Sequence, residues 1–268
     1  MPSNGILNIL FIGDIIGRPG RRAVTGLLPG IKGEFDIGFT VANCENSAGG
    51  FGVTGKIVGE LTDLGIDVLT SGNHIWDRRN VAEELDSFPN VLRPLNYPPG
   101  LPGRGRAVFE SSGGHRVAVV NLQGRVFMRP IDCPFRKADE VLKTIGERIV
   151  LVDMHAEATS EKVAMGWHLD GRVSAVVGTH THVQTSDERV LPGGTAYITD
   201  VGMTGPHDSV IGIEKEAIIR RFLTEVPNRF EVGKEDVRLS GLVVSVDTAT
   251  GRAVGVERIH RCLDHGGD

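Results

Sequence analysis

Short apolar runs alternate with amphipathic stretches through the first third of the chain. The apolar runs are rich in β-branched residues and have the length of buried strands. They occupy residues 9–12, 39–42, 66–70, 149–152 and 173–177. Helical patterns follow the first three of these regions, at Gly20–Ile31, Gly55–Leu64 and Val81–Phe88. This alternation predicts strand–helix–strand units with parallel strands.

The pattern changes in the second half of the chain. Two pairs of runs predict β-hairpins, at 107–111 with 116–122 and at 241–246 with 253–259. Helical patterns cover Lys137–Arg148 and Ser160–Leu169. No linker, repeat or low-complexity tract interrupts the chain. We therefore expect one domain over residues 1–268, with strands that are parallel at the start and antiparallel later.

The apolar runs share a second property, which is that each leads into polar residues able to bind a metal. A single strand that ends on a polar residue is usually just surface, but five such endings are hard to assign to chance. Ligands of open α/β sheets gather at the carboxyl ends of strands. Carboxylate, amide and imidazole groups without a thiolate suit Mn, Fe or Zn, often as a pair. The residues are Asp14, Glu45, Asn46, Asn73, His74, His155, His180 and His182.

Composition and net charge exclude several classes of partner for this protein. The chain has 268 residues, 40% hydrophobic and 24% charged, with a net charge of −5. That charge argues against an extended surface for DNA or RNA. The three cysteines indicate no disulfide framework. No apolar stretch has transmembrane length, and the N-terminus lacks a signal-peptide pattern, so we expect a cytoplasmic protein without a membrane partner. Homo-oligomerisation stays open.

The order of these motifs resembles that of the calcineurin-like metallophosphoesterases. The matching segments are Gly13-Asp14, Glu45-Asn46, Gly72-Asn73-His74, His155 and Gly178-Thr179-His180-Thr181-His182. Two positions depart from the superfamily, which usually has histidine where Ile16 stands and a bridging aspartate where Glu45 stands. Both departures are features of a bacterial subfamily, the YmdB-like phosphodiesterases, which this chain resembles closely around Asp14, Glu45 and His74.

The resemblance implies an α/β fold, a four-layer α/β/β/α sandwich of mixed β-sheets with flanking helices and a dimetal site at the strand carboxyl ends. It also implies how the ligands are divided between the two ions. Asp14, Asn46 and His182 would hold one ion, with Asn46 replacing the missing histidine. Asn73, His155 and His180 would hold the other, and Glu45 would bridge both. The ions would be Fe or Mn, with Zn as the alternative.

The activity that the resemblance implies is hydrolysis of small phosphodiesters, such as 2′,3′-cyclic nucleotides or cyclic AMP. A hydroxide bridging the two cations would attack phosphorus. His74, next to a ligand, is the candidate general acid or phosphate clamp, unless it only hydrogen-bonds a ligand. Two alternatives remain open: a phosphomonoesterase of the same fold, and a metal-containing regulator that binds a nucleotide or RNA without turnover.

Three further features are candidates for a role at this site. The glycines of Gly49–Gly52 would either bring backbone amides close to a phosphate or only supply turn geometry. His207, in an expected loop over Gly202–Ser209, could line the pocket. Asp153 could orient a ligating imidazole or simply end its strand.

Overall fold

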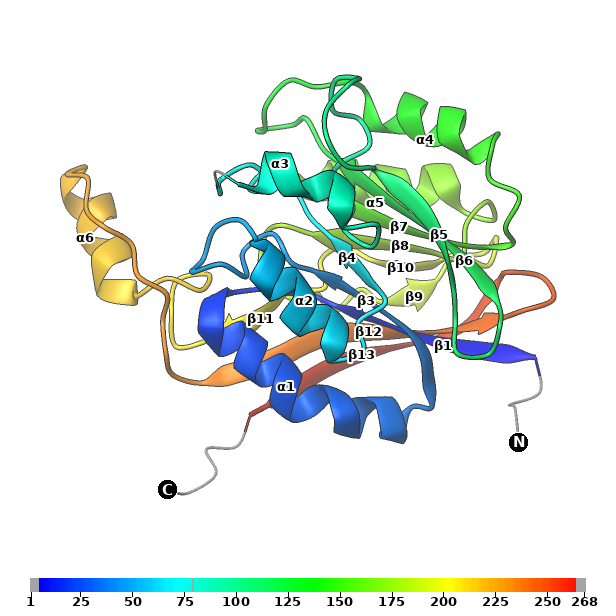
Figure 1. Cartoon of the computed structure of the whole chain (residues 1–268), viewed down its shortest axis with the longest axis horizontal. Coiled ribbons are helices and arrows are strands. Elements are labelled where there is room, and N and C mark those ends of the chain that lie inside the picture. The colour runs from blue at the N-terminus through cyan, green and yellow to red at the C-terminus, as the bar shows by residue number, and fades with distance from the viewer. Residues whose placement is uncertain (1–4, 79, 264–268) are drawn as a thin grey trace.

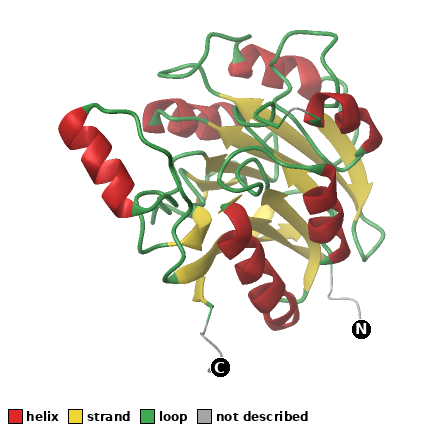
Figure 2. Cartoon of the chain, turned by 60° about the vertical axis from the view of Figure 1, so that its left-hand side comes forward, coloured by secondary structure: helices red, strands yellow, loops and turns green. Residues whose placement is uncertain are grey.

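The computed structural model describes residues 5–78 and 80–263, and within these ranges it contains two mixed β-sheets and six α-helices (Figure 1). The α/β class expected from the sequence is therefore confirmed. The two sheets lie face to face, and most helices lie against their outer surfaces (Figures 1 and 2).

The first sheet has seven strands and is built on a parallel core. Its strands β1, β3 and β4 are parallel neighbours, as the sequence predicts. The C-terminal hairpin of β12 and β13 adds to the free side of β1 in antiparallel orientation. The strands are β1 (Ile6–Ile12), β2 (Asp14–Ile15), β3 (Ile37–Asn43), β4 (Val68–Thr70), β11 (Met203–Pro206), β12 (Val237–Asp247) and β13 (Ala253–Cys262).

The second sheet has six strands in the order β5-β6-β7-β8-β10-β9. The predicted hairpin of β5 and β6 is confirmed. The expectation of antiparallel strands in the rest of this region is wrong, because β6, β7, β8 and β10 are parallel neighbours. The bounds are β5 (Arg106–Glu110), β6 (Arg116–Gln123), β7 (Ile149–His155), β8 (Ala175–Thr179), β9 (Arg189–Val190) and β10 (Ala196–Ile198).

The helices largely follow the predicted pattern. They are α1 (Gly17–Glu34), α2 (Gly55–Asp63), α3 (Val81–Glu84), α4 (Pro134–Leu142), α5 (Thr159–Leu169) and α6 (Lys215–Thr224), and a short 3₁₀ helix follows α3 at Leu85–Ser87. The prediction for α4 begins too late and ends too late. Pro134 occupies the first turn, where its missing N–H leaves no hydrogen bond unmade.

Alternate residues of each strand face different parts of the core. Ile9 and Phe11 of β1 pack between the sheets against Val119 and Leu151 of the second sheet. The neighbouring side chains of β1 instead face the outer helices α1 and α2. A third cluster packs α4 and α5 on the other face of the second sheet. These buried layers hold the strand ends in fixed positions.

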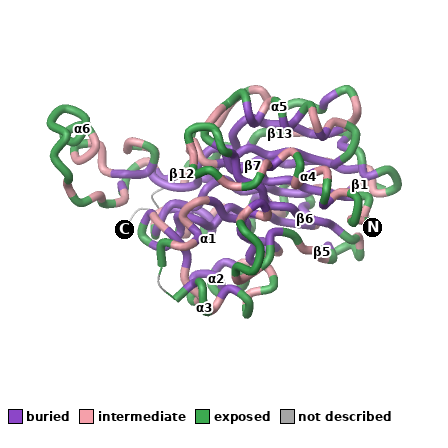
Figure 3. The backbone as a smooth tube through the Cα atoms, turned by 90° about the horizontal axis from the view of Figure 1, so that it is seen from above, coloured by how far each residue is buried: buried purple, intermediate pink, exposed green. Residues whose placement is uncertain are grey.

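Several elements in the last third of the chain lie outside the sequence predictions, among them the short strands β9 and β10. The expected loop Gly202–Ser209 contains strand β11, which pairs with β2 and β12. Helix α6 projects away from the rest of the molecule and buries none of its residues (Figures 1 and 3).

Candidate metal centre

All eight residues expected at the strand ends meet at one edge of the sheets. Asp14 lies in β2, directly after β1, and Glu45 and Asn46 follow β3. The turn after β4 supplies Asn73 and His74. The second sheet supplies His155 from the last position of β7, and His180 and His182 from the loop after β8. The edge of the first sheet thus contributes the acids and amides, and the second contributes most of the imidazoles.

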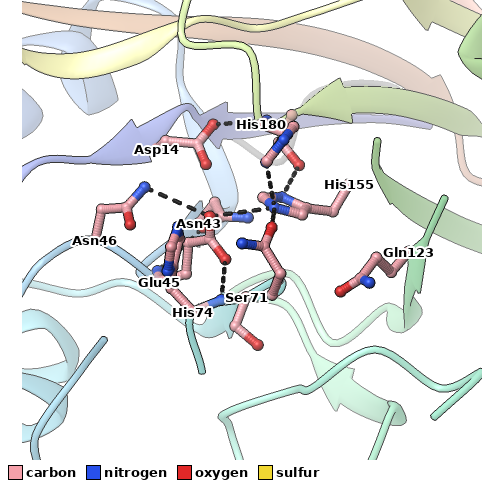
Figure 4. A network of polar contacts seen from close by, with 12 residues as sticks. Asp14, Asn43, Glu45, Asn46, Ser71, His74, Gln123, His155 and His180 are labelled. Atoms are coloured by element: carbon pink, nitrogen blue, oxygen red, sulfur yellow. Dashed lines mark hydrogen bonds and ion pairs between the residues drawn. The ribbon is translucent and has the colours of Figure 1, made fainter. Parts of the chain in front are cut away.

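The best-defined part of this centre surrounds His155 Nε2 (Figure 4). Three possible ligand atoms lie close to that nitrogen: Glu45 Oε1 at 3.1 Å, Asn73 Oδ1 at 3.1 Å and His180 Nδ1 at 3.0 Å. Glu45, His155 and His180 each offer one ligand atom, and these three atoms all lie within 4.8 Å of one another. This convergence of lone pairs is the arrangement that a cation stabilises.

Asp14, Asn46 and His182 form a second group beside the first. Asn46 Nδ2 lies 3.0 Å from His182 Nε2, and Asp14 Oδ1 lies 3.9 Å from the same nitrogen. Asp14 Oδ1 and Asn46 Oδ1 are buried, and neither has a hydrogen-bond partner among the described residues. A buried acceptor without a partner is costly. These two oxygens therefore fit the metal ion that the fold family implies at this position.

Hydrogen bonds fix which nitrogen of each imidazole faces the centre. The Thr179 hydroxyl donates to Asp153 at 2.7 Å, so it can only accept from His155 Nδ1–H, which lies 2.9 Å away. His155 Nε2 is therefore the ring nitrogen that faces the cluster. His182 Nδ1 lies 2.9 Å from the Ile211 carbonyl, which leaves its Nε2 to the centre in the same way. Asp153 thus acts through Thr179, and its orienting role is the interpretation that the geometry favours.

The charges within the cluster depend on one another. Burial raises the pKa of Asp14 to about 6. Burial also acts to raise the pKa of Glu45, but the nearby His155 outweighs it and lowers that pKa to about 2. Burial, together with His155, lowers the pKa of His180 to about 3, so this imidazole is neutral and able to ligate. Burial acts to lower the pKa of His155, but the Glu45 carboxylate outweighs it and raises that pKa to about 9. A metal ion bound here would displace the His155 proton, because an imidazole ligates only in its neutral form.

A buried ion pair supports the loop that carries His180 and His182. Lys162 Nζ lies 2.6 Å from Asp200 Oδ2, and both side chains are almost fully buried. The same Asp200 oxygen accepts from the Thr181 backbone N–H and hydroxyl at 3.0 and 2.7 Å. His180 and His182, on either side of Thr181, have φ values of 99° and 67°. Asp200 thereby holds both imidazoles in a backbone conformation that non-glycine residues rarely adopt.

Sequence reasoning missed this pair, because nothing local marks Lys162 as buried in α5 or Asp200 as facing the loop.

One glycine of the predicted motifs also has a clear structural reason. A Cβ at Gly72 would collide with the His155 ring and the Glu45 carboxylate. The glycine therefore lets the turn after β4 approach the cluster.

His74 differs from the other seven residues. Its backbone N–H donates to Glu45 Oε2 at 3.1 Å, but its side chain lies apart from the cluster. Its Nδ1 lies 2.7 Å from Asp77 Oδ2, and its ring packs edge-on against Phe51 with 5.1 Å between centroids. With Nδ1 held by Asp77, Nε2 is the ring nitrogen left to meet a substrate.

The cluster opens into a cavity of about 560 Å³. His74, Glu45, Asn46, His180 and His182 line one end of it. That volume falls in the range of about 300–1,000 Å³ typical of small-molecule sites.

The other features singled out in the sequence lie outside the cluster. Gly49, Gly50 and Gly52 all have positive φ, so turn geometry accounts for their presence. His207 lies in a separate hollow that borders His182, where its ring packs against His260. Cys44 is a free, buried thiol. Among the helices of the described residues, none has the length and apolar character needed to cross a membrane.

Comparison with known proteins adds sequence and structural relatives. The family model described as YmdB-like protein matches residues 10–259. The chain is 50% identical over 261 residues to the 2′,3′-cyclic-nucleotide 2′-phosphodiesterase of Bacillus subtilis (strain 168), covering 97% of this chain and 98% of that one. A solved hypothetical protein of Thermus thermophilus is 44% identical, with a TM-score of 0.89 over 96% of this chain and 99% of that one. A solved phosphatase of Mycoplasma pneumoniae is 34% identical, with a TM-score of 0.91 over 96% and 94%.

Proposed function

Because the chain belongs to the YmdB-like protein family and is a hydrolase of phosphate esters, we propose that it hydrolyses small cyclic phosphodiesters, with 2′,3′-cyclic nucleotides or cyclic AMP as substrates. The observation that carries this proposal is the convergence of Glu45, Asn73 and His180 on His155 Nε2, at 3.1, 3.1 and 3.0 Å, beside a cavity that Glu45 and His180 line. The relative from Bacillus subtilis, matched over almost the whole chain, supports the cyclic diester as the substrate class.

The residues that would hold the metal ions fall into the two groups described above. Asn73, His155 and His180 would hold one ion, Asp14, Asn46 and His182 the other, and Glu45 would bridge them. When bound, the ions supply Lewis acidity and lower the pKa of a coordinated water. Fe or Mn suits this set of imidazole, amide and carboxylate groups, with Zn as the alternative.

His74 is the residue of this chain that we assign to proton transfer. In the reaction, the oxygen of water bonds to phosphorus and the bond from phosphorus to one ribose oxygen breaks, which leaves a phosphomonoester. The departing oxygen needs a proton. His74 Nε2 donates it, while Asp77 holds the other ring nitrogen in place. Its place on the cavity wall, outside the cluster, supports this role over metal binding.

A panel of small esters tests the proposal. Metal content is measured on the purified protein, and turnover is compared for 2′,3′-cyclic AMP, 3′,5′-cyclic AMP, bis-(p-nitrophenyl) phosphate and p-nitrophenyl phosphate. We expect bound metal and faster hydrolysis of the diesters. A strong preference for p-nitrophenyl phosphate would favour a phosphomonoesterase. Metal binding without turnover of any ester would favour a regulatory protein.

The single domain over residues 1–268 and the cytoplasmic location stay predictions.

A further inference from the structure

The active-site cavity has a second end that the chemistry of phosphate ester hydrolysis does not use. Away from the cluster, the cavity is lined by Ile218, Arg221, Phe222, Glu225 and Phe230, which belong to α6 and the segment after it. These side chains are largely apolar or aromatic, whereas the cluster end is polar. A molecule filling the cavity therefore meets metal ligands on one side, and on the other a wall of apolar and aromatic side chains with the charged Arg221 and Glu225.

The geometry of this wall resembles a stacking platform. The Arg221 guanidinium lies over the face of the Phe230 ring, 5.2 Å from its centroid. Phe222 lines the same cavity, although 78% of its surface is exposed. No residue of α6 is buried, so packing of the fold does not explain Phe222, whereas Phe230, after the helix, is half-buried. An exposed aromatic ring beside an arginine plane is the arrangement on which nucleobases stack in single-stranded nucleic acid sites.

The dimensions and chemistry agree with a nucleotide as the occupant. The cavity volume of about 560 Å³ suits one small ligand rather than a peptide or a second protein. A cyclic nucleotide carries its anionic diester at one end and its flat base at the other. That is the same polarity as the two ends of the cavity.

We propose that the wall formed by Arg221, Phe222 and Phe230 is a nucleobase subsite, which makes this chain select nucleoside cyclic phosphates over cyclic diesters without a base. The inference rests on the proposed function, since the phosphate must lie at the metal cluster for the base to reach α6. Stacking tolerates all four bases, so the subsite should discriminate between presence and absence of a base more than between bases.

Two aromatic variants and a matched control test the subsite. Phe222→Ala and Phe230→Ala each remove one ring of the wall. Leu223→Ala truncates a side chain of the same helix that is 80% exposed and lies outside the cavity lining. For each metal-loaded protein, kcat and KM are measured with 2′,3′-cyclic AMP and with glycerol 1,2-cyclic phosphate, which has no base. Binding of adenosine 3′-monophosphate and glycerol 2-phosphate is measured in parallel.

We expect each aromatic variant to raise KM for 2′,3′-cyclic AMP about 10-fold with kcat nearly unchanged, because loss of stacking removes binding that is equal in the ground and transition states. KM for glycerol 1,2-cyclic phosphate should not change. Adenosine 3′-monophosphate should bind about 10-fold more weakly to the same variants, and Leu223→Ala should resemble the wild type.

Several results would overturn the subsite. Equal losses for ligands with and without a base would do so, as would an equal effect of Leu223→Ala. A changed oligomeric state in the Phe222 and Leu223 variants, with unchanged nucleotide affinity, would instead identify a face covered by a second copy of the chain. If the wild type binds adenosine 3′-monophosphate in preference to glycerol 2-phosphate but hydrolyses no diester, the subsite stands and the proposed function fails.

Discussion

The two ends of the active-site cavity are built in opposite ways. At the cluster end, Asp14, Glu45 and His155 are fully buried, and each is fixed by neighbouring strands of a packed sheet. At the other end, α6 projects from the molecule without burying a side chain (Figure 3). The first region is held by the core, and the second is held only by the chain segments that lead to it.

This difference separates two tasks. Catalytic groups need positions fixed to within a fraction of an ångström, and strand ends in a close-packed core provide them. A surface that selects substrates can change without disturbing that core, because nothing in the core depends on α6. Substitutions in the two regions should therefore differ in effect, from loss of metal and activity at the cluster to almost no change in stability on α6.

The largest effect should follow Glu45→Gln at the buried end. This substitution keeps the shape but removes the shared negative charge that two close cations need between them. We expect loss of at least one metal and a fall in kcat on the order of 10⁴-fold, since Lewis-acid stabilisation supplies several kcal/mol. Metal analysis, steady-state kinetics and circular dichroism on one preparation measure the metal content, kcat and folding. Glu161→Gln, a buried glutamate that binds backbone amides elsewhere, is the control and should keep its metal. Full metal content and near-normal turnover in a folded Glu45→Gln protein would refute the bridge.

His74→Ala should have the next largest effect and should leave the metal in place. General acid catalysis contributes about 10²–10⁴-fold, so kcat should fall by that much for a poor leaving group. The fall should be smaller for nitrophenolate, which needs little protonation. The kcat values for a substrate with a poor leaving group and for one that releases nitrophenolate are measured on one preparation, together with its metal content. Metal loss would move His74 into the ligand set, and equal falls for both substrates would make it a phosphate clamp.

Thr179→Val tests the support behind the buried end. Valine keeps the volume but breaks the link from Asp153 to His155 Nδ1. Removing such a partner typically costs about 10–100-fold in metal affinity or activity. Competition with a chelator measures the affinity. Thr195→Val, which removes another buried hydroxyl hydrogen bond far from the cluster, should leave metal affinity unchanged. Equal affinities in the two variants would show that Asp153 only ends its strand.

The smallest effect should come from the exposed end. Ile219→Ser on α6, where the side chain is 52% exposed, should change the free energy of unfolding by no more than about 0.5 kcal/mol. Leu61→Ala on the buried face of α2 should cost about 2–5 kcal/mol. Urea unfolding compares the two. A large destabilisation by Ile219→Ser would mean that α6 packs on something in solution, and the contrast between the regions would disappear.

The same contrast explains what the sequence could predict. The cluster residues are each next to a β-branched apolar run, so their position at strand ends follows from local pattern alone. The parallel order of β1, β3 and β4 then brings them to one edge. Sequence therefore predicted which residues gather, although it did not predict the hydrogen bonds that orient them.

The features that escaped prediction depend on contacts distant in sequence. Strands β2 and β11 are two and four residues long and exist only through pairing with each other and with β12. The Lys162–Asp200 pair joins a helix to a loop 38 residues further along the chain. The segment around α6 led to no prediction, because its role depends on the cavity that it faces rather than on its own composition.

The left-handed backbone at His180 and His182 lowers the stability of the protein, although both imidazoles are needed at the metal centre. Selection for heat resistance and selection for turnover should therefore favour different residues at these two positions. A non-glycine residue in that region costs on the order of 1–3 kcal/mol, and glycine or asparagine at either position would lower this cost. Laboratory evolution that screens only for survival of heating should therefore replace one of the two histidines by glycine or asparagine. A screen that also demands ester hydrolysis should retain both and find its stabilising substitutions elsewhere in the protein.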